Sequence, residues 1–259
     1  KIHKWSVVEN SRQPILLSHN DPLVQLEVDT KGELIVTTAE DGKIRVWDPQ
    51  EYRLIKEVVV EEDNFIGGDV WQLNFNQDGT RLGTFQKDSP LNALSFKLWS
   101  WPNMELISTY RFPAKVEGTA FSPNGRTIAY ANSENFELTT YDVTDTQTLN
   151  VNKDHGDRVF GINYSKDGRY IATACFDGYA RVFKADTLEL LTDPLPFGFS
   201  YGASLDFTSD SSYLLTRTNV GRDENNLVVW DLKLGEEKFR FEHSSAIFNH
   251  AFSSDNNHL

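Results

Sequence analysis

A short sequence pattern recurs six times along the chain, and this repeat restricts the fold more than any other feature. Each copy consists of an apolar residue, two variable residues, a further residue that is usually apolar, a spacer, an aromatic residue or valine, and a polar turn. The copies are Leu23 to Gly32, Val70 to Gly79, Val116 to Gly125, Val159 to Gly168, Gly202 to Ser211 and Ile247 to Asn256. Their last residues lie 47, 46, 43, 43 and 45 positions apart. A nearly constant period of this size indicates a repeat architecture.

The segments around each turn predict four strands per repeat. A second apolar segment follows the turn, as in Leu34 to Thr38, and a third closes on an aromatic residue, as in Ile44 to Trp47 and Leu227 to Trp230. A fourth apolar stretch comes next, for example Glu237 to Phe241. Nothing in the chain has a sustained helical period, and evenly spaced short strands with Gly, Asn and Asp turns indicate an all-β closed array. We therefore expect a β-propeller of four-stranded antiparallel blades.

Both ends of the chain match parts of a repeat. Lys1 to Trp5 is similar to Lys43 to Trp47, so residues 1–18 are expected to form the outer half of a blade. Residues 245–259 match the inner half of another blade and stop where its second strand should start. We expect one propeller domain over residues 1–259, incomplete at both ends, with five complete and two partial blades. The two halves could close a ring of six, but the truncated last strand favours a ring of seven blades that continues outside this chain.

Four polar and aromatic positions carry a resemblance to the WD-repeat family of β-propellers. One repeat has His19, Thr37, Asp41 and Trp47. Another has His155, Thr173, Asp177 and Phe183 at the same offsets of 18, 22 and 28 residues from the histidine. The resemblance implies a buried hydrogen-bond chain in which the histidine lies between the aspartate and the threonine hydroxyl, with the tryptophan N–H at its end. Phe183 has no N–H, so the second chain should stop at Thr173.

Other repeats lack parts of this set. Thr84 with Trp99 and Thr216 with Trp230 have no evident histidine, so we expect packing, more than hydrogen bonds, to hold those blades. A histidine, an aspartate and a hydroxyl could also form a nucleophilic triad. The structural interpretation is favoured, because the same arrangement occurs in two repeats and uses a threonine inside a strand.

A second set of positions is a candidate for partner binding. By the resemblance, the second residue of each first strand and the residue before the second turn lie on the face that the family uses for partners. Large aromatic residues at these positions are suitable interface anchors. The candidates, including two residues near the starts of the strands, are Trp71, Phe160, Phe248, Phe176, Arg158 and Tyr201. Two alternatives stay open: the aromatics pack between neighbouring blades, or they are ordinary scattered surface residues.

Composition excludes several classes of function. With 38 acidic and 25 basic residues the formal charge is −13, which disfavours direct binding to nucleic acid or to anionic lipid. Cys175 is the single cysteine, so no internal disulfide can form, and the six histidines are not at zinc spacing. No apolar run is long enough to span a bilayer. We expect a cytoplasmic protein with no metal, no cofactor and no membrane contact.

Three functions remain open on these observations. The first is a non-catalytic scaffold that binds a protein or peptide on one propeller face. The second is a sensor or regulatory domain fused in the same chain to an effector, such as a nucleotide-hydrolysing switch. The third and least favoured is an enzyme that uses Glu27 or Asp206, the two carboxylates at the fifth position of the first strands.

Overall fold

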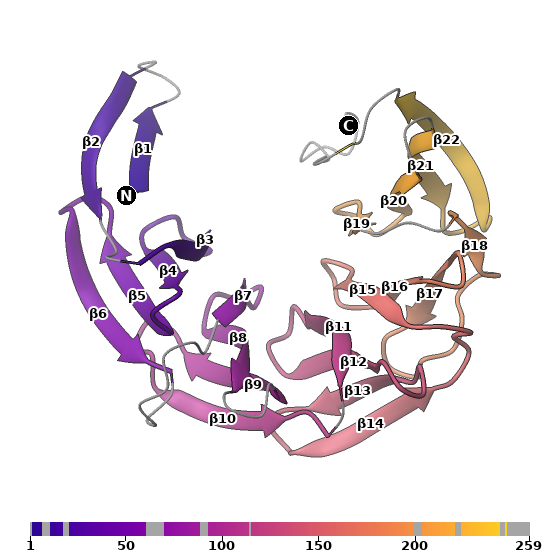
Figure 1. Ribbon diagram of the computed structural model, residues 1–259, viewed down its shortest axis with the longest axis horizontal. Coiled ribbons are helices and arrows are strands. Elements are labelled where there is room, and N and C mark those ends of the chain that lie inside the picture. The colour runs from indigo at the N-terminus through magenta and orange to yellow at the C-terminus, as the bar shows by residue number, and fades with distance from the viewer. Residues whose placement is uncertain are drawn as a thin grey trace. The chain divides into compact units, whose positions relative to one another are not determined.

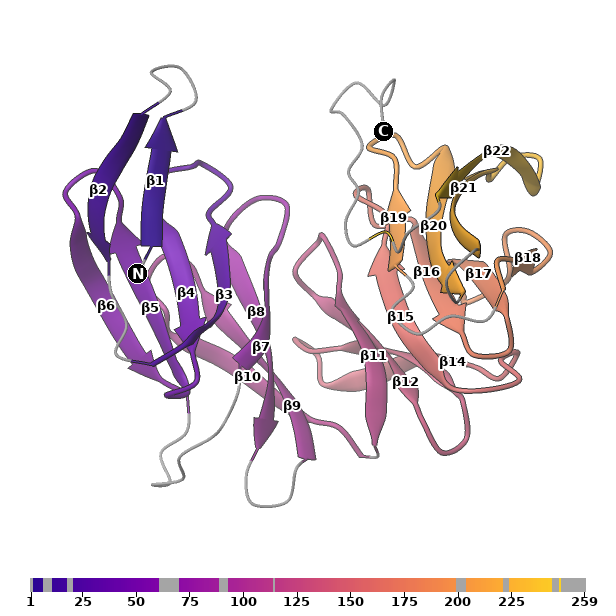
Figure 2. The ribbon, with the colours of Figure 1, turned by 45° about the horizontal axis from the view of Figure 1, so that its top comes forward.

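The computed structural model describes residues 2–6, 11–17, 21–60, 70–88, 93–113, 115–198, 204–220, 224–243 and 247. Only the backbone is described for residues 2–6, 11–17, 71, 87, 88, 93, 218–220, 224, 225 and 243. The described residues form strands and turns and no helix (Figures 1 and 2). No described part of the chain forms a helix long and apolar enough to span a membrane.

Five four-stranded antiparallel sheets account for most of the described residues, which confirms the predicted blades. The first blade is β3 (Leu23–Val28), β4 (Ile35–Ala39), β5 (Lys43–Asp48) and β6 (Arg53–Val59). The second is β7 (Val70–Phe75), β8 (Arg81–Asp88), β9 (Ala93–Ser100) and β10 (Leu106–Arg111). The third is β11 (Val116–Phe121), β12 (Thr127–Asn132), β13 (Leu138–Asp142) and β14 (Gln147–Asn152).

The remaining sheets follow the same order. The fourth blade is β15 (Val159–Tyr164), β16 (Tyr170–Cys175), β17 (Tyr179–Lys184) and β18 (Leu195–Pro196). The fifth is β19 (Ser204–Phe207), β20 (Tyr213–Val220), β21 (Glu224–Asp231) and β22 (Glu236–His243). A separate two-stranded sheet pairs β1 (Ile2–Ser6) with β2 (Ser11–Leu17), where the outer half of a blade was expected. The expected half-blade over residues 245–259 lies outside the described residues except for Ile247.

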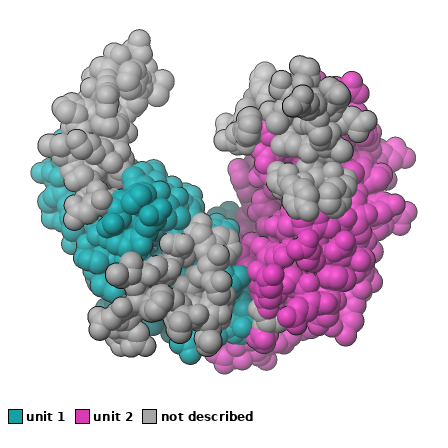
Figure 3. Space-filling model, in the orientation of Figure 1, with its two compact units in different colours: residues 1–112 teal, residues 113–259 magenta. Residues whose placement is uncertain are grey.

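The chain divides into two compact units, residues 1–112 and residues 113–259 (Figure 3). The first unit holds the β1–β2 sheet and the first two blades, and the second unit holds the other three blades. The number of blades in the complete ring stays a prediction.

A side-chain cap closes the turn between the first and second strands of every blade. The capping oxygen accepts hydrogen bonds from backbone N–H groups four or five residues further on, which fixes the hairpin. The caps and their donors are Asp29 with Glu33 and Leu34, Asn76 with Thr80 and Arg81, Ser122 with Thr127, Ser165 with Tyr170, and Thr208 with Tyr213. Each turn then places its last patterned residue in the left-handed region, with φ of 67° to 74° at four glycines and 60° at Ser211. This backbone requirement explains why the repeat pattern ends in Gly so often.

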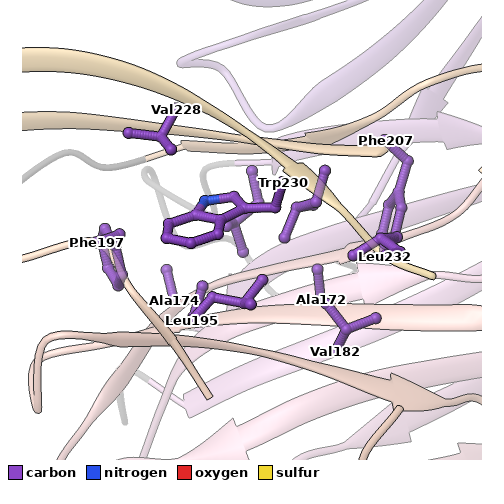
Figure 4. Close-up of a cluster of buried hydrophobic side chains, with 12 residues drawn as sticks. Ala172, Ala174, Val182, Leu195, Phe197, Phe207, Val228, Trp230 and Leu232 are labelled. Atoms are coloured by element: carbon purple, nitrogen blue, oxygen red, sulfur yellow. The ribbon is translucent and has the colours of Figure 1, made fainter. Parts of the chain in front are cut away.

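The core lies between neighbouring blades. Trp230 of β21 is 4% exposed and packs among side chains of the fourth and fifth blades (Figure 4). Small residues on the facing strands, Ala172 and Ala174 of β16, leave room for its indole ring. In the first unit, Val36 and Ile44 of the first blade pack in the same way against Leu73 and Trp99 of the second. Each blade therefore depends on its neighbour for burial of its apolar face.

Candidate functional site

A tryptophan–threonine hydrogen bond joins the second and third strands in three blades. Each indole Nε1 donates to a threonine Oγ1, and all three threonines are fully buried. The pairs are Trp47 with Thr37 at 2.7 Å, Trp99 with Thr84 at 3.0 Å, and Trp230 with Thr216 at 2.9 Å. The second and fifth blades, which we expected to be held more by packing than by hydrogen bonds, therefore also have this bond. A buried indole N–H needs an acceptor whether or not a histidine follows.

In the fourth blade, where Phe183 stands at the tryptophan position, the threonine is hydrogen-bonded to a histidine. Nε2 of His155 lies 2.9 Å from Oγ1 of Thr173, and its ring packs 5.6 Å from the ring of Phe183. Burial, followed by the nearby Arg181 cation, lowers the pKa of His155 from 6.5 to about 4. The imidazole is therefore neutral near pH 7, and its Nε2 donates to the hydroxyl of Thr173 or accepts from it according to the tautomer.

Asp177 differs from the arrangement that the resemblance implies. Its carboxylate forms an ion pair with Arg181 at 2.7 Å and accepts hydrogen bonds from the backbone N–H groups of Gly156 and Tyr179. Nδ1 of His155 has no hydrogen-bond partner among the described residues. The physical reason is the arginine four residues further on, whose two N–H groups fit a carboxylate better than one imidazole N–H does.

The first blade repeats this ion pair. Asp41 accepts two hydrogen bonds from Arg45, at 2.5 and 3.2 Å. His19, the first member of the expected chain in this blade, lies outside the described residues. The arginine–aspartate pair is thus common to both repeats that carry the full polar set.

Two of the polar groups considered for catalysis are buried or already hydrogen-bonded. Thr173 is fully buried, so a substrate cannot reach its hydroxyl. Glu27 accepts a hydrogen bond from Gln25, and Asp206 lies in β19. Among the residues that the structure describes, no group of three or more His, Cys, Asp or Glu could hold a metal ion.

Three of the candidate partner-binding residues come together in the fourth blade, and we call Arg158, Phe160 and Phe176 the aromatic patch. The backbone N–H of Phe176 bonds to the carbonyl of Arg158 at 3.0 Å, across the start of β15 and the end of β16. Equivalent bonds place Glu40 in the first blade and Ser133 in the third at the position of Phe176. The aromatic residue at this position is therefore a feature of the fourth blade and not of the fold.

The side chains of the aromatic patch contact one another. The rings of Phe160 and Phe176 lie 4.6 Å apart at 50°, and the guanidinium of Arg158 lies 4.9 Å from the centre of the Phe176 ring. Nη1 of Arg158 also donates to Oε1 of Glu117 at 3.0 Å, and the arginine side chain is still 42% exposed. A stacked and paired guanidinium has lost much of its conformational freedom, so these contacts hold the Arg158 side chain in place.

Phe160 packs between neighbouring blades, which is one of the alternatives considered for it. It is half-buried and packs against the core cluster that contains Leu205 and Trp230 of the fifth blade. Its ring also contacts Phe176, which is half-buried as well. The other candidates cannot be placed, since Phe248 and Tyr201 lie outside the described residues and only the backbone of Trp71 is described, in β7.

Glu117 is a residue of this surface that the sequence did not single out. It stands at the second position of β11, as Phe160 does in β15, so the repeat alignment already placed it on the same face. The alignment could not show that Glu117 forms an ion pair with Arg158. The two residues are 41 positions apart and meet only when the third and fourth blades pack.

The sequence model described as "WD domain, G-beta repeat" matches residues 11–48 and 146–184. These two segments contain the first three strands of the first blade and the first three strands of the fourth blade. These matches, together with the five four-stranded antiparallel blades, support the WD-repeat β-propeller superfamily for this chain.

Curated relatives were found among fungal proteins. The chain is similar to eukaryotic translation initiation factor 3 subunit I of Lodderomyces elongisporus, at 22% identity over 68% of this chain and 52% of the relative. It is also similar to the subunit of that name from Candida glabrata, at 23% identity over 84% of this chain and 64% of the relative. Protein SOF1 of Saccharomyces cerevisiae is 22% identical over 81% of this chain and 40% of its own length. The chain spans about half the length of the curated relatives it matches.

Proposed function

We propose that this chain is a non-catalytic protein-binding module that holds a polypeptide partner on the aromatic patch. The observation that carries the proposal is the contact among Arg158, Phe160 and Phe176, which are partly exposed at one end of the fourth blade. Aromatic and arginine side chains are the most frequent anchors of protein interfaces. A scaffold role follows because the blades use their other buried side chains for packing.

The relatives support the same class of function. Several carry the name of a subunit of a translation initiation factor, and a subunit is by definition held in a complex by other proteins. We propose that this chain likewise works inside a protein complex. The proposal extends to a cytoplasmic location and to the absence of direct contacts with nucleic acid, since a formal charge of −13 opposes binding to phosphate backbones.

The test compares proteins that co-purify with the tagged wild-type chain and with a double variant, Phe160→Ala with Phe176→Ala. We expect a loss of one or more specific partners from the variant, because truncation of two contacting anchors typically weakens an interface by at least about tenfold. Arg158→Ala is a second, milder variant, since its half-exposed side chain contributes little to the core. Quantitative mass spectrometry of the captured proteins supplies the measurement.

The matched control is Leu149→Ala with Val151→Ala on β14. These side chains are 44% and 47% exposed in the same compact unit, but they lie outside the aromatic patch. Thermal melts of all variants identify any that do not fold. If the folded patch variants retain every partner that the control retains, the proposal is wrong.

A further inference from the structure

We infer that the partner presents a cationic side chain next to an apolar one, with the cation bound by Glu117 and the apolar group placed on Phe160 and Phe176. This inference rests on the proposed function and adds the chemical class of the partner. The first observation is the carboxylate of Glu117. Its Oε1 accepts from Arg158 at 3.0 Å, whereas its Oε2 makes no hydrogen bond to any described residue. The side chain is 23% exposed, so this oxygen is available to a second donor.

The charges around the aromatic patch favour a cation. The first strands of the third and fourth blades start at this end, and the second strands end here. Three of the basic residues at this end are already paired with carboxylates. The pairs are Arg158 with Glu117, Arg181 with Asp177, and Lys153 with Glu137.

The charged side chains at this end that form none of these ion pairs are mainly acidic. Glu134 and Asp154 are exposed, and Asp157 is half-buried and accepts the backbone N–H of Arg158. Against these three carboxylates stands Lys115, which is exposed. The local field therefore has the same negative sign as the whole chain, whose formal charge is −13. A field of one sign attracts a cationic segment and repels an acidic one.

The aromatic pair supplies the apolar half of the site. The guanidinium of Arg158 lies over Phe176, and no cation of the described residues lies over the ring of Phe160. An apolar side chain can extend the Phe160–Phe176 contact, and a cation bound to Glu117 would lie at the edge of the same surface. An acidic partner would have to bind the remaining N–H groups of Arg158 while it faced Glu117 and Asp157, which is the less favourable arrangement.

A random peptide library displayed on phage provides the probe. Peptides are selected on the wild-type protein after counter-selection on the Phe160→Ala, Phe176→Ala variant. We expect the retained peptides to be enriched in Arg or Lys beside Leu, Phe or Trp. Enrichment in Asp or Glu would overturn the inference and assign an anion to Arg158 instead.

Charge variants then test Glu117 directly. Binding of a selected peptide should be about tenfold weaker to Glu117→Gln, because one charge-assisted hydrogen bond is lost. The control is Glu189→Gln, which makes the same change in charge at an exposed carboxylate paired with Lys184, at the opposite end of the fourth blade. Equal binding to both variants would overturn the assignment of Glu117.

The outcomes separate this inference from the proposed function. If the double aromatic variant loses its partners but Glu117→Gln keeps them with full affinity, the protein-binding role stands and the cationic partner is wrong. If neither variant loses a partner, the proposed function itself fails.

Discussion

At the scale of single residues, buried polar groups find partners that the repeat pattern does not specify. The resemblance to the WD-repeat family implied a contact between Asp177 and His155, and the carboxylate instead bonds to Arg181. The preference comes from chemistry at short range: a guanidinium offers two parallel donors and keeps its charge when it is buried, whereas a buried imidazole loses its proton. The offsets predict which side chains come near one another, but not which of several competing hydrogen bonds forms.

The buried histidine predicts a pH dependence of stability. The pKa of His155 is about 4 in the folded protein against 6.5 for an exposed histidine, so the unfolded chain binds the proton more readily. The contribution of His155 to stability is therefore fully present above the pKa that this histidine has in the unfolded chain. It is lost as the pH falls toward the pKa in the folded protein. We expect the free energy of unfolding to decrease by about 2 kcal/mol between about pH 7 and about pH 5.

Urea denaturation curves at a series of pH values measure this effect. The comparison is between the wild type and His155→Gln, which lacks the titrating group, so carboxylates and the other histidines contribute equally to both. The decrease over this pH range should be smaller in the variant. Parallel pH profiles for the two proteins would show that His155 is not responsible.

At the scale of elements, the threonine–tryptophan bond fixes the second strand of a blade to the third. Thr84 of β8 and Trp99 of β9 are both buried in the second blade, which has no histidine at the expected position. The strands themselves were predictable, because alternation and turn residues are local signals. The bond in this blade was not predicted, since packing, more than hydrogen bonds, was expected to hold the blades without an evident histidine.

Thr84→Val tests the bond. Valine keeps the shape of threonine but leaves the indole N–H of Trp99 without its acceptor, so we expect a loss of about 1–3 kcal/mol in the free energy of unfolding. A double-mutant cycle with Trp99→Phe, which removes the donor, isolates the interaction from the change in packing. Coupling near zero between the two substitutions would contradict a stabilising role for this hydrogen bond.

At the scale of the whole molecule, stability comes from the packing of one blade on the next. In the second compact unit, β11 and β15 lie side by side (Figure 1). Gly118 of β11 allows this approach, because a Cβ at that position would lie 2.9 Å from Cγ1 of Ile162 and 3.1 Å from the carbonyl oxygen of Val159. A backbone oxygen cannot move away as a flexible side chain can.

Gly118→Ala should therefore separate the third and fourth blades. We expect a loss of about 1–3 kcal/mol in the free energy of unfolding, the usual effect of overpacking a buried contact. Gly161→Ala on β15 is the matched control, since its Cβ would meet the Cβ of Ala174 at 3.4 Å, close to ordinary contact. Chemical denaturation of both variants measures the difference, and equal stabilities would show that close approach at Gly118 is not limiting.

The sequence by itself determined the four-strand repeat, the turns that end in a left-handed residue, and the three candidate residues of the aromatic patch. These follow from alternation, from glycine at positive φ and from position within a repeat, all of which act over a few residues. Only the tertiary structure decided that Glu117 forms an ion pair with Arg158, that Phe160 packs on the fifth blade, and that Asp177 forms an ion pair with Arg181. Each of those outcomes depends on groups brought together by blade packing or on a competition between donors at one buried oxygen, and neither is encoded in spacing along the chain.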